Sequence, residues 1–184
     1  TINLAARRST LSQPLSELQV TEYTFHIPRE FIHKTASQNT LVINASTYIQ
    51  NFEGLDGKTV DSYGAAKQHL SQFLAEESET YGFRTLDLYL FTIYGQGDRP
   101  THLVPSLVSA AKKGEGISLS PGNQLMNLIY IDDVVRNFST MLTTSDEFSY
   151  RRHFMWSEEY ISVRDLVKSL ESVSKIEIDC LWGE

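Results

Sequence analysis

The 184-residue sequence contains one cysteine, Cys180, and has no long apolar run and no cluster of basic residues. A single cysteine excludes an internal disulfide and fits a reducing, cytoplasmic location. No apolar segment approaches the roughly 18 residues of a membrane-spanning helix, and no signal peptide is visible. The net charge of −7 argues against a general nucleic-acid binder. We therefore expect partners other than membranes and nucleic acids.

Segments with strand character alternate with segments of helical periodicity, as expected for an α/β fold with a doubly wound, mainly parallel sheet. Strands are predicted at 2–6, 41–45, 85–91, 117–119, 128–131, 153–156 and 176–181. Helices are predicted at 15–34 with an interruption at Pro28, and at 63–81, 103–113, 134–142 and 162–173. The chain begins and ends abruptly, so we expect a piece of a longer protein.

The helix predicted at 63–81 opens with Tyr63 and Lys67, which lie one turn apart on the same face. A lysine ammonium near a phenol favours the phenolate and lowers the phenol's pKa from about 10. Such a phenol can exchange a proton with a substrate alcohol or carbonyl near neutral pH. An exposed i,i+4 pair without any function is the alternative for this spacing.

Two further polar groups are predicted at the same edge of the sheet. Ser46 and Thr47 end the strand that begins at Leu41, and Thr92 follows the next strand. In parallel α/β sheets, ligands bind beyond the carboxyl ends of the strands. The helix that carries Tyr63 lies between these two strands in the sequence, so the three features converge on one site.

The chain also resembles a known family, the extended short-chain dehydrogenases/reductases, or NAD-dependent epimerase/dehydratase family, which modify nucleotide sugars. The resemblance is strongest to the branch of CDP-abequose synthase-like deoxysugar reductases and epimerases. It rests on several motifs that occur in the family's order: Asn3-Leu4-Ala5-Ala6, Val42 to Thr47, Tyr63-x-x-x-Lys67, Tyr94 to Asp98, Leu103-Val104-Pro105 and Tyr130 to Val134.

The resemblance implies a Rossmann-like sheet, NAD or NADP as cofactor, a nucleotide-sugar substrate and a homodimer. It implies that Tyr63 is the general acid/base, that Lys67 lowers its pKa and binds the nicotinamide ribose, and that Thr47 binds the reacting sugar oxygen. Further cofactor contacts are expected from Ala5, Ala6, Ser46 and Leu90, and substrate contacts from Thr92, His102 and Leu103. No metal site is expected.

The resemblance also implies a division into two domains. Residues 1–100 and about 126–160 would form the carboxyl-terminal part of the NAD(P)-binding domain. Residues about 101–125 and 161–184 would form part of a substrate-binding domain.

Three departures from the family pattern keep other functions open. The family's glycine-rich pyrophosphate turn is absent from the sequence. Thr24 stands where many members carry an asparagine, and Met126 where sugar epimerases often carry an arginine. The alternatives are a catalytically silent NAD(P)-binding sensor or scaffold of the same fold, or a chain that is inactive on its own.

Overall fold

The computed structural model describes residues 2–3, 14–51, 61–143 and 148–183. The chain divides into two compact units, which we treat separately. The first unit contains Thr1–Leu90 and Thr144–Met155, and the second contains Phe91–Thr143 and Trp156–Glu184. The predicted division assigned three segments of the second unit to the cofactor domain, residues 91–100, 126–143 and 156–160, and that assignment stays a prediction. Ala5 and Ala6 lie outside the described residues.

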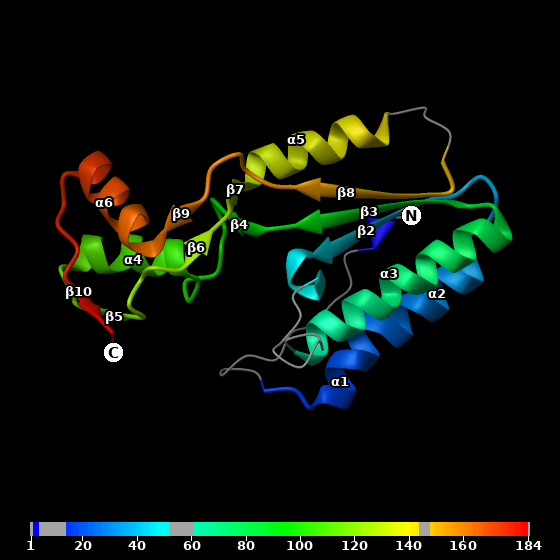
Figure 1. Ribbon diagram of the computed structural model, residues 1–184, viewed down its shortest axis with the longest axis horizontal. Helices are drawn as coiled ribbons and strands as arrows, with labels where there is room; N and C mark the ends of the chain where they lie inside the picture. The colour runs from blue at the N-terminus through cyan, green and yellow to red at the C-terminus, as the bar shows by residue number, and fades with distance from the viewer. Residues whose placement is uncertain (1, 4–13, 52–60, 144–147, 184) are drawn as a thin grey trace. The chain divides into compact units, whose positions relative to one another are not determined.

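The first unit contains a four-stranded parallel sheet in the order β1-β2-β3-β8 (Figure 1). Its strands are β1 (Ile2–Asn3), β2 (Leu41–Thr47), β3 (Arg84–Leu90) and β8 (Tyr150–Met155). Parallel strands joined by helices confirm the predicted α/β class. The two long central strands are buried on both faces, although β2 carries Asn44, Ser46 and Thr47 and β3 carries Asp87 among their apolar residues.

The helices of the first unit lie on one face of this sheet (Figure 1). They are α1 (Glu17–Thr21), the π-helical turn η1 (Glu22–His26), α2 (Ile27–Thr35) and α3 (Ser62–Tyr81). Helix α3 matches its predicted span and ends at Gly82, whose left-handed φ of 72° suits glycine. A short 3-10 turn, η2 (Tyr48–Asn51), follows β2.

Pro28 does not break the helix predicted at 15–34. A proline lacks an N–H, and its ring would clash with the carbonyl four residues earlier, at Thr24. The chain widens into the π turn η1 just before α2, and Pro28 occupies the first turn of α2, where an N–H is dispensable. The helix therefore continues from Glu17 to Thr35 with a local change of pitch.

An apolar cluster joins these helices to the sheet. Its buried members are Ile32, Val42, Leu70, Leu74 and Phe83. Ile32 comes from α2, Leu70 and Leu74 come from α3, and Val42 comes from β2. This cluster fixes α3 over β2.

The second unit is built from short strands and three helices. The strand pairs are β4 (Thr92–Tyr94) with β7 (Leu128–Tyr130), β5 (Ile117–Leu119) with β10 (Cys180–Trp182), and β6 (Leu125–Met126) with β9 (Ile161–Ser162). The helices are α4 (Leu103–Lys113), α5 (Ile131–Leu142) and α6 (Val163–Ser174). An apolar core lies between α4, α6 and β5 and contains Leu107, Ala110, Leu119, Val163, Leu166, Val167 and Ile178.

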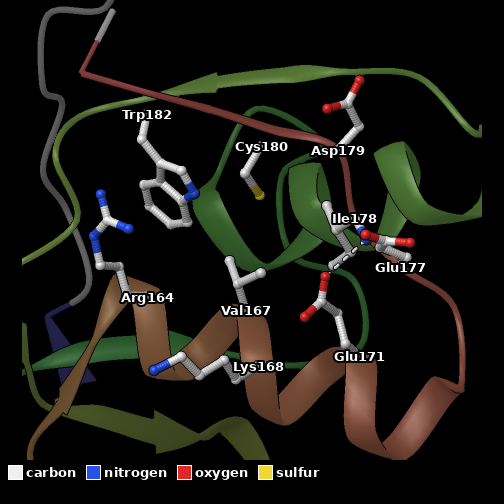
Figure 2. Close-up of a pocket in the computed structure, with 9 residues that line it drawn as sticks. All are labelled: Arg164, Val167, Lys168, Glu171, Glu177, Ile178, Asp179, Cys180 and Trp182. Atoms are coloured by element: carbon white, nitrogen blue, oxygen red, sulfur yellow. Dashed lines mark hydrogen bonds between the residues drawn. The ribbon is translucent and has the colours of Figure 1, made fainter.

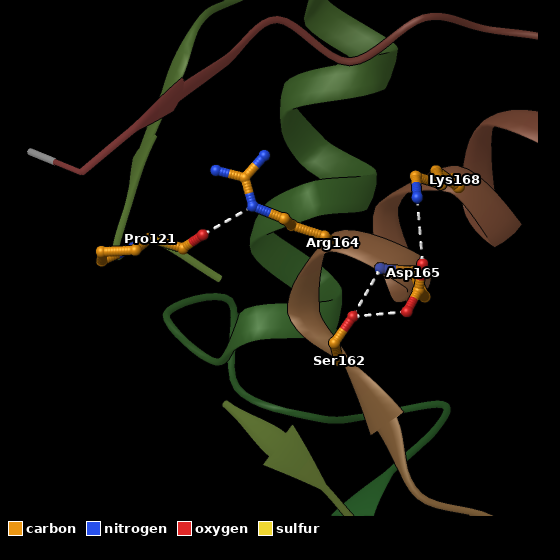
Figure 3. Close-up of polar contacts among 5 residues, drawn as sticks. All are labelled: Pro121, Ser162, Arg164, Asp165 and Lys168. Atoms are coloured by element: carbon orange, nitrogen blue, oxygen red, sulfur yellow. Dashed lines mark hydrogen bonds and ion pairs between the residues drawn. The ribbon is translucent and has the colours of Figure 1, made fainter. Parts of the chain in front are cut away.

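Helix α6 begins as its sequence predicts (Figure 3). The Ser162 hydroxyl accepts a hydrogen bond from the Asp165 backbone N–H at 3.0 Å and donates one to the Asp165 carboxylate at 2.6 Å. Lys168 pairs with the same carboxylate at 3.1 Å. These contacts satisfy an N–H at the helix start that would otherwise lack a partner.

Two local predictions for the second unit were wrong. The strand predicted at 176–181 is limited to Cys180–Trp182, because Ile178 is drawn into the core and its N–H donates to Glu171 on α6 at 2.9 Å. The helix predicted at 134–142 begins three residues earlier, at Ile131, so Asp132 and Asp133 lie inside its first turn, where Asp133 pairs with Arg136 at 2.7 Å. Their charge still suits the positive end of the helix.

Candidate functional site

Tyr63 is the second residue of α3 and is half-buried. The helix is capped by Asp61, whose carboxylate accepts a hydrogen bond from the Gly64 N–H at 2.7 Å. Tyr63 therefore lies at the positive end of a 20-residue helix. A helix N-terminus favours negative charge nearby.

Lys67 follows one turn later and is the largest fully buried side chain among the described residues. Its ammonium donates a hydrogen bond to the carbonyl oxygen of Ala45 on β2 at 2.6 Å. Burial lowers the pKa of Lys67 from 10.5 to about 8, and the carboxylate of Asp87 opposes this decrease. The ammonium is therefore the main form of Lys67 at pH 7.

Thr47, the predicted sugar-binding residue, ends β2 and is buried. Its hydroxyl accepts a hydrogen bond from the Ile49 N–H at 3.4 Å, and its own N–H donates to the side chain of Gln50 at 3.3 Å. Gln50 is anchored in turn, because its amide donates to Ser71 at 3.0 Å and to the Tyr89 hydroxyl at 2.9 Å. The strand end at Thr47 is thus held by helix α3 and strand β3 together.

Ser46 points to the opposite side of β2 from Thr47, under α3. Its hydroxyl donates to Asp87 on β3 and lies 3.2 Å from the Ser71 hydroxyl. The neighbouring Asn44 donates to Ser46 at 2.9 Å and to Asp87 at 2.8 Å. This buried network occupies the Ser46 hydroxyl, and the predicted contact of Ser46 with a cofactor stays a prediction.

Leu90 ends β3 beside Thr47, since the two residues are register partners in the parallel ladder. Thr92, His102 and Leu103 belong to the second unit. Thr92 begins β4, His102 precedes α4 and binds Asp98 through Nδ1 at 2.7 Å, and Leu103 is the first residue of α4. Tyr63, Lys67, Thr47 and Leu90 thus lie within one unit, and the substrate contacts of the other three stay predictions.

A family model for the NAD dependent epimerase/dehydratase family matches residues 2–155 of the chain. The chain belongs to this family. The matched region contains Tyr63, Lys67 and Thr47, and it covers all the described residues of the first unit.

Named members of the family are related to the chain in sequence. It is 31% identical to CDP-abequose synthase from Yersinia pseudotuberculosis over 109 residues, which are 59% of this chain and 38% of that protein. It is 33% identical to CDP-abequose synthase from Salmonella muenchen over 84 residues, 44% of this chain and 28% of that protein. The matched segments therefore cover well under half the length of these relatives.

Solved structures confirm the epimerase/dehydratase fold. MoeE5, solved in complex with UDP-glucuronic acid and NAD, aligns with a TM-score of 0.85 and 18% identity over 100% of this chain and 64% of that one. UDP-glucuronic acid 4-epimerase from Bacillus cereus, solved with UDP-glucuronic acid and NAD, aligns with a TM-score of 0.83 and 18% identity over 97% and 60%. At this identity the likeness shows the Rossmann-like fold.

The second unit of this family member has a pocket of its own, between α6 and β10, with a volume of about 320 Å³ (Figure 2). Arg164 covers the ring of Trp182 at 4.3 Å, and carboxylates of Glu171, Glu177 and Asp179 line the pocket beside Lys168. Burial, followed by the charges of Glu171 and Asp179, raises the pKa of the Cys180 thiol. A thiol held in its neutral form is a poor nucleophile, so Cys180 is not a good candidate for a catalytic nucleophile.

No metal site accompanies either location: in residues 14–51, 61–143 and 148–183, no group of three or more His, Cys, Asp or Glu side chains could hold a metal ion. No helix in these segments is long and apolar enough to cross a membrane.

Sequence reasoning missed the buried residues that support the site. Asn44, Gln50, Ser71 and Asp87 form hydrogen bonds around Ser46 and Thr47. A signal was present: Asn44 and Ser46 alternate along β2, and Asp87 and Tyr89 alternate along β3, which places each pair on one face of its strand. Polar residues at period two normally mark a solvent-facing side, so only the packing of α3 reveals that they are buried.

Proposed function

We propose that the protein carrying this chain is an NAD(P)-dependent oxidoreductase or epimerase that acts on a nucleotide-activated sugar. Tyr63 is the general acid/base, Lys67 keeps its pKa low, and Thr47 hydrogen-bonds the reacting sugar oxygen. The observation that carries the proposal is the joint placement of these groups: Tyr63 lies at the start of α3, and the buried ammonium of Lys67 reaches β2 two residues before Thr47.

Lys67 fits a nicotinamide ribose. An ammonium has three N–H donors, and the Ala45 carbonyl takes one of them. The remaining donors suit the paired hydroxyls of a ribose, as the family resemblance implies. When bound, the nicotinamide supplies or accepts the hydride. Tyr63 transfers the proton at the sugar oxygen, and its half-buried position limits the access of water.

A comparison of Tyr63→Phe with the wild type tests this proposal. The measurement is turnover of a panel of CDP- and UDP-linked 4-keto sugars with NADH or NADPH by the protein that carries the chain. Loss of a general acid/base costs about 10²- to 10⁴-fold, so we expect kcat/KM to fall by that range. Tyr81→Phe is the matched control, because Tyr81 is exposed at the far end of the same helix. Equal rates for Tyr63→Phe and the wild type would refute the role of Tyr63.

A catalytically silent sensor or scaffold is the second candidate, and Thr24 favours it. Thr24 is fully buried in the π turn η1, where many members of the family carry an asparagine. Calorimetry discriminates between the two: nicotinamide binding without turnover of any sugar supports the sensor, and turnover removes it. This chain alone, which lacks the glycine-rich turn, is expected to bind dinucleotide weakly.

Two further features belong to the proposal. A homodimer through α1, α2 and α3 is supported by exposed apolar side chains on α1 and α2, among them Leu18, Ile27 and Phe31. A cytoplasmic location is the other, and the lone cysteine supports it because it fits a reducing compartment.

A further inference from the structure

Asp87 is a fully buried carboxylate in the middle of β3, and the proposed reaction does not use it directly. Removing a carboxylate from water is unfavourable, even after relaxation of the surrounding protein. An apolar side chain would suit this position of a buried strand better. The groups around Asp87 must therefore stabilise its charge.

The hydrogen bonds of Asp87 come from neutral groups on two neighbouring strands. Its Oδ1 accepts from Asn44 Nδ2 at 2.8 Å and from the Ser46 hydroxyl, and its Oδ2 accepts from the Tyr150 hydroxyl at 2.7 Å. These donors stabilise the carboxylate without cancelling its charge. Burial and the charge of Asp87 also raise the pKa of Tyr150, so that phenol stays protonated and continues to donate.

The same contacts surround the hydrogen-bond acceptor of Lys67. Asn44 and Ser46, which both bind Asp87, are the residues immediately before and after Ala45. The Ala45 carbonyl oxygen accepts the hydrogen bond from the Lys67 ammonium at 2.6 Å. Asp87 thus binds β2 on both sides of Ala45, whose carbonyl oxygen accepts the hydrogen bond from Lys67.

The charged and titratable side chains around Lys67 also indicate Asp87 as its partner. Strand β2 carries no titratable side chain, β3 contributes Asp87 and Tyr89 on the face under α3, and β8 contributes Tyr150 and the more exposed Arg152. Tyr63 lies one turn away on α3, and Tyr48 lies on η2. The charge of Asp87 is the electrostatic contribution that raises the pKa of Lys67, against the decrease that burial causes.

We propose that Asp87 is a positioning residue for Lys67: its buried carboxylate is the counter-charge of the Lys67 ammonium and fixes the segment of β2 that accepts the ammonium's hydrogen bond. Through Lys67, Asp87 sustains the acidity of Tyr63, and this last step rests on the proposed function. The link between Asp87 and Lys67 does not depend on that function and can be measured without any substrate.

The experiment is a pH titration of the Lys67 Cε resonance by NMR in the full chain with ¹³C-labelled lysine. Lys67→Met assigns the resonance. We expect a midpoint near 8 for the wild type and a midpoint lower by about one pH unit or more for Asp87→Asn, because the amide keeps an acceptor oxygen and removes the charge. Asp87→Glu, which keeps the charge, should stay within about half a pH unit of the wild type.

An unchanged midpoint in Asp87→Asn overturns the proposal, because a merely structural Asp87 would leave the titration of Lys67 in place. If Asp87→Asn does not fold, Asp87→Glu and the wild type still decide. If the midpoint of wild-type Lys67 lay far below neutrality, no carboxylate would stabilise the ammonium. If Asp87→Glu lowered the midpoint strongly, the charge at position 87 would not be what sets the pKa of Lys67. Loss of sugar turnover in Tyr63→Phe tests the proposed function separately, so either idea can fail alone.

Discussion

The two units bury very different side chains. Ten of the eleven buried polar or charged side chains among the described residues belong to the first unit, and the second unit contributes only Asn127. The core between α4 and α6 in the second unit consists of aliphatic side chains. In the first unit, helix α3 rests partly on an apolar cluster and partly on the network around Asp87 and Lys67.

This difference suggests that the buried polar groups of the first unit serve a function and not only packing. Burial of aliphatic side chains packs α4 against α6 in the second unit, as the hydrophobic effect predicts. A buried ionic group often contributes no net stability compared with apolar residues of the same size. The polar side of α3 is therefore better explained by what it holds, namely the ammonium of Lys67 beside Tyr63, than by a need for stability.

Leu107→Ala should produce the largest change in stability and tests the apolar half of the comparison. Leu107 lies on α4 with no exposed surface, so its truncation leaves a cavity. Such truncations cost about 3 kcal/mol or more. Both tryptophans, Trp156 and Trp182, belong to the second unit, so urea unfolding followed by tryptophan fluorescence reports on this unit.

Leu125→Ala is the control for this substitution, because Leu125 is 68% exposed on β6 of the same unit. We expect its cost to remain below about 0.5 kcal/mol. If the two substitutions cost the same, the second unit would not depend on a packed aliphatic core, and its contrast with the first unit would disappear.

Lys67→Met should change the pH dependence of stability and tests the polar half. The folded pKa of Lys67 is about 8, and the ordinary value is 10.5. Between these values the folded chain holds the neutral amine while the unfolded chain still binds a proton, so the free energy of unfolding rises with pH. The rise is about 3 kcal/mol for the full shift, and Lys67→Met should lack it.

The measurement is urea unfolding followed by circular dichroism from pH 7 to about 10, expressed as the difference between wild type and Lys67→Met. Burial raises the pKa of Tyr89 and Tyr150, which makes the free energy of unfolding fall with pH. Both proteins share this effect, so it cancels in the difference between them. If the free energies of unfolding of the two proteins changed in parallel with pH, burial would not lower the pKa of Lys67.

The parts of the fold that sequence reasoning predicted are those with local signals. Helix α4 has its predicted limits, Leu103–Lys113, because an apolar stripe ends at Gly114 in a left-handed conformation. The strand predicted at 176–181 failed because Ile178 fills a core that the local sequence does not show. The α/β class was predicted from the alternation of strands and helices along the chain. Errors at the ends of single elements do not change this alternation.

The site was predictable only in part, for a similar reason. The helical spacing of Tyr63 and Lys67 is visible in the sequence, as is the position of Thr47 at a strand end. The role of Asp87 is not visible, since its partners Asn44 and Tyr150 lie 43 and 63 residues away in the chain. Their contact depends on the parallel register of β2, β3 and β8.

Ser162→Ala should have the smallest effect and sharpens the comparison at the surface of the second unit. Ser162 caps α6, and removal of a capping hydroxyl costs about 1 kcal/mol. Ser169→Ala is the matched control, because Ser169 is exposed in the interior of the same helix and alanine favours helix there. Tryptophan fluorescence during urea unfolding measures both, with Trp182 close to α6 through Arg164. If Ser162→Ala were as harmless as Ser169→Ala, the start of α6 would be fixed by the burial of Val163 and Leu166 alone, and the second unit would depend on polar contacts even less than its core indicates.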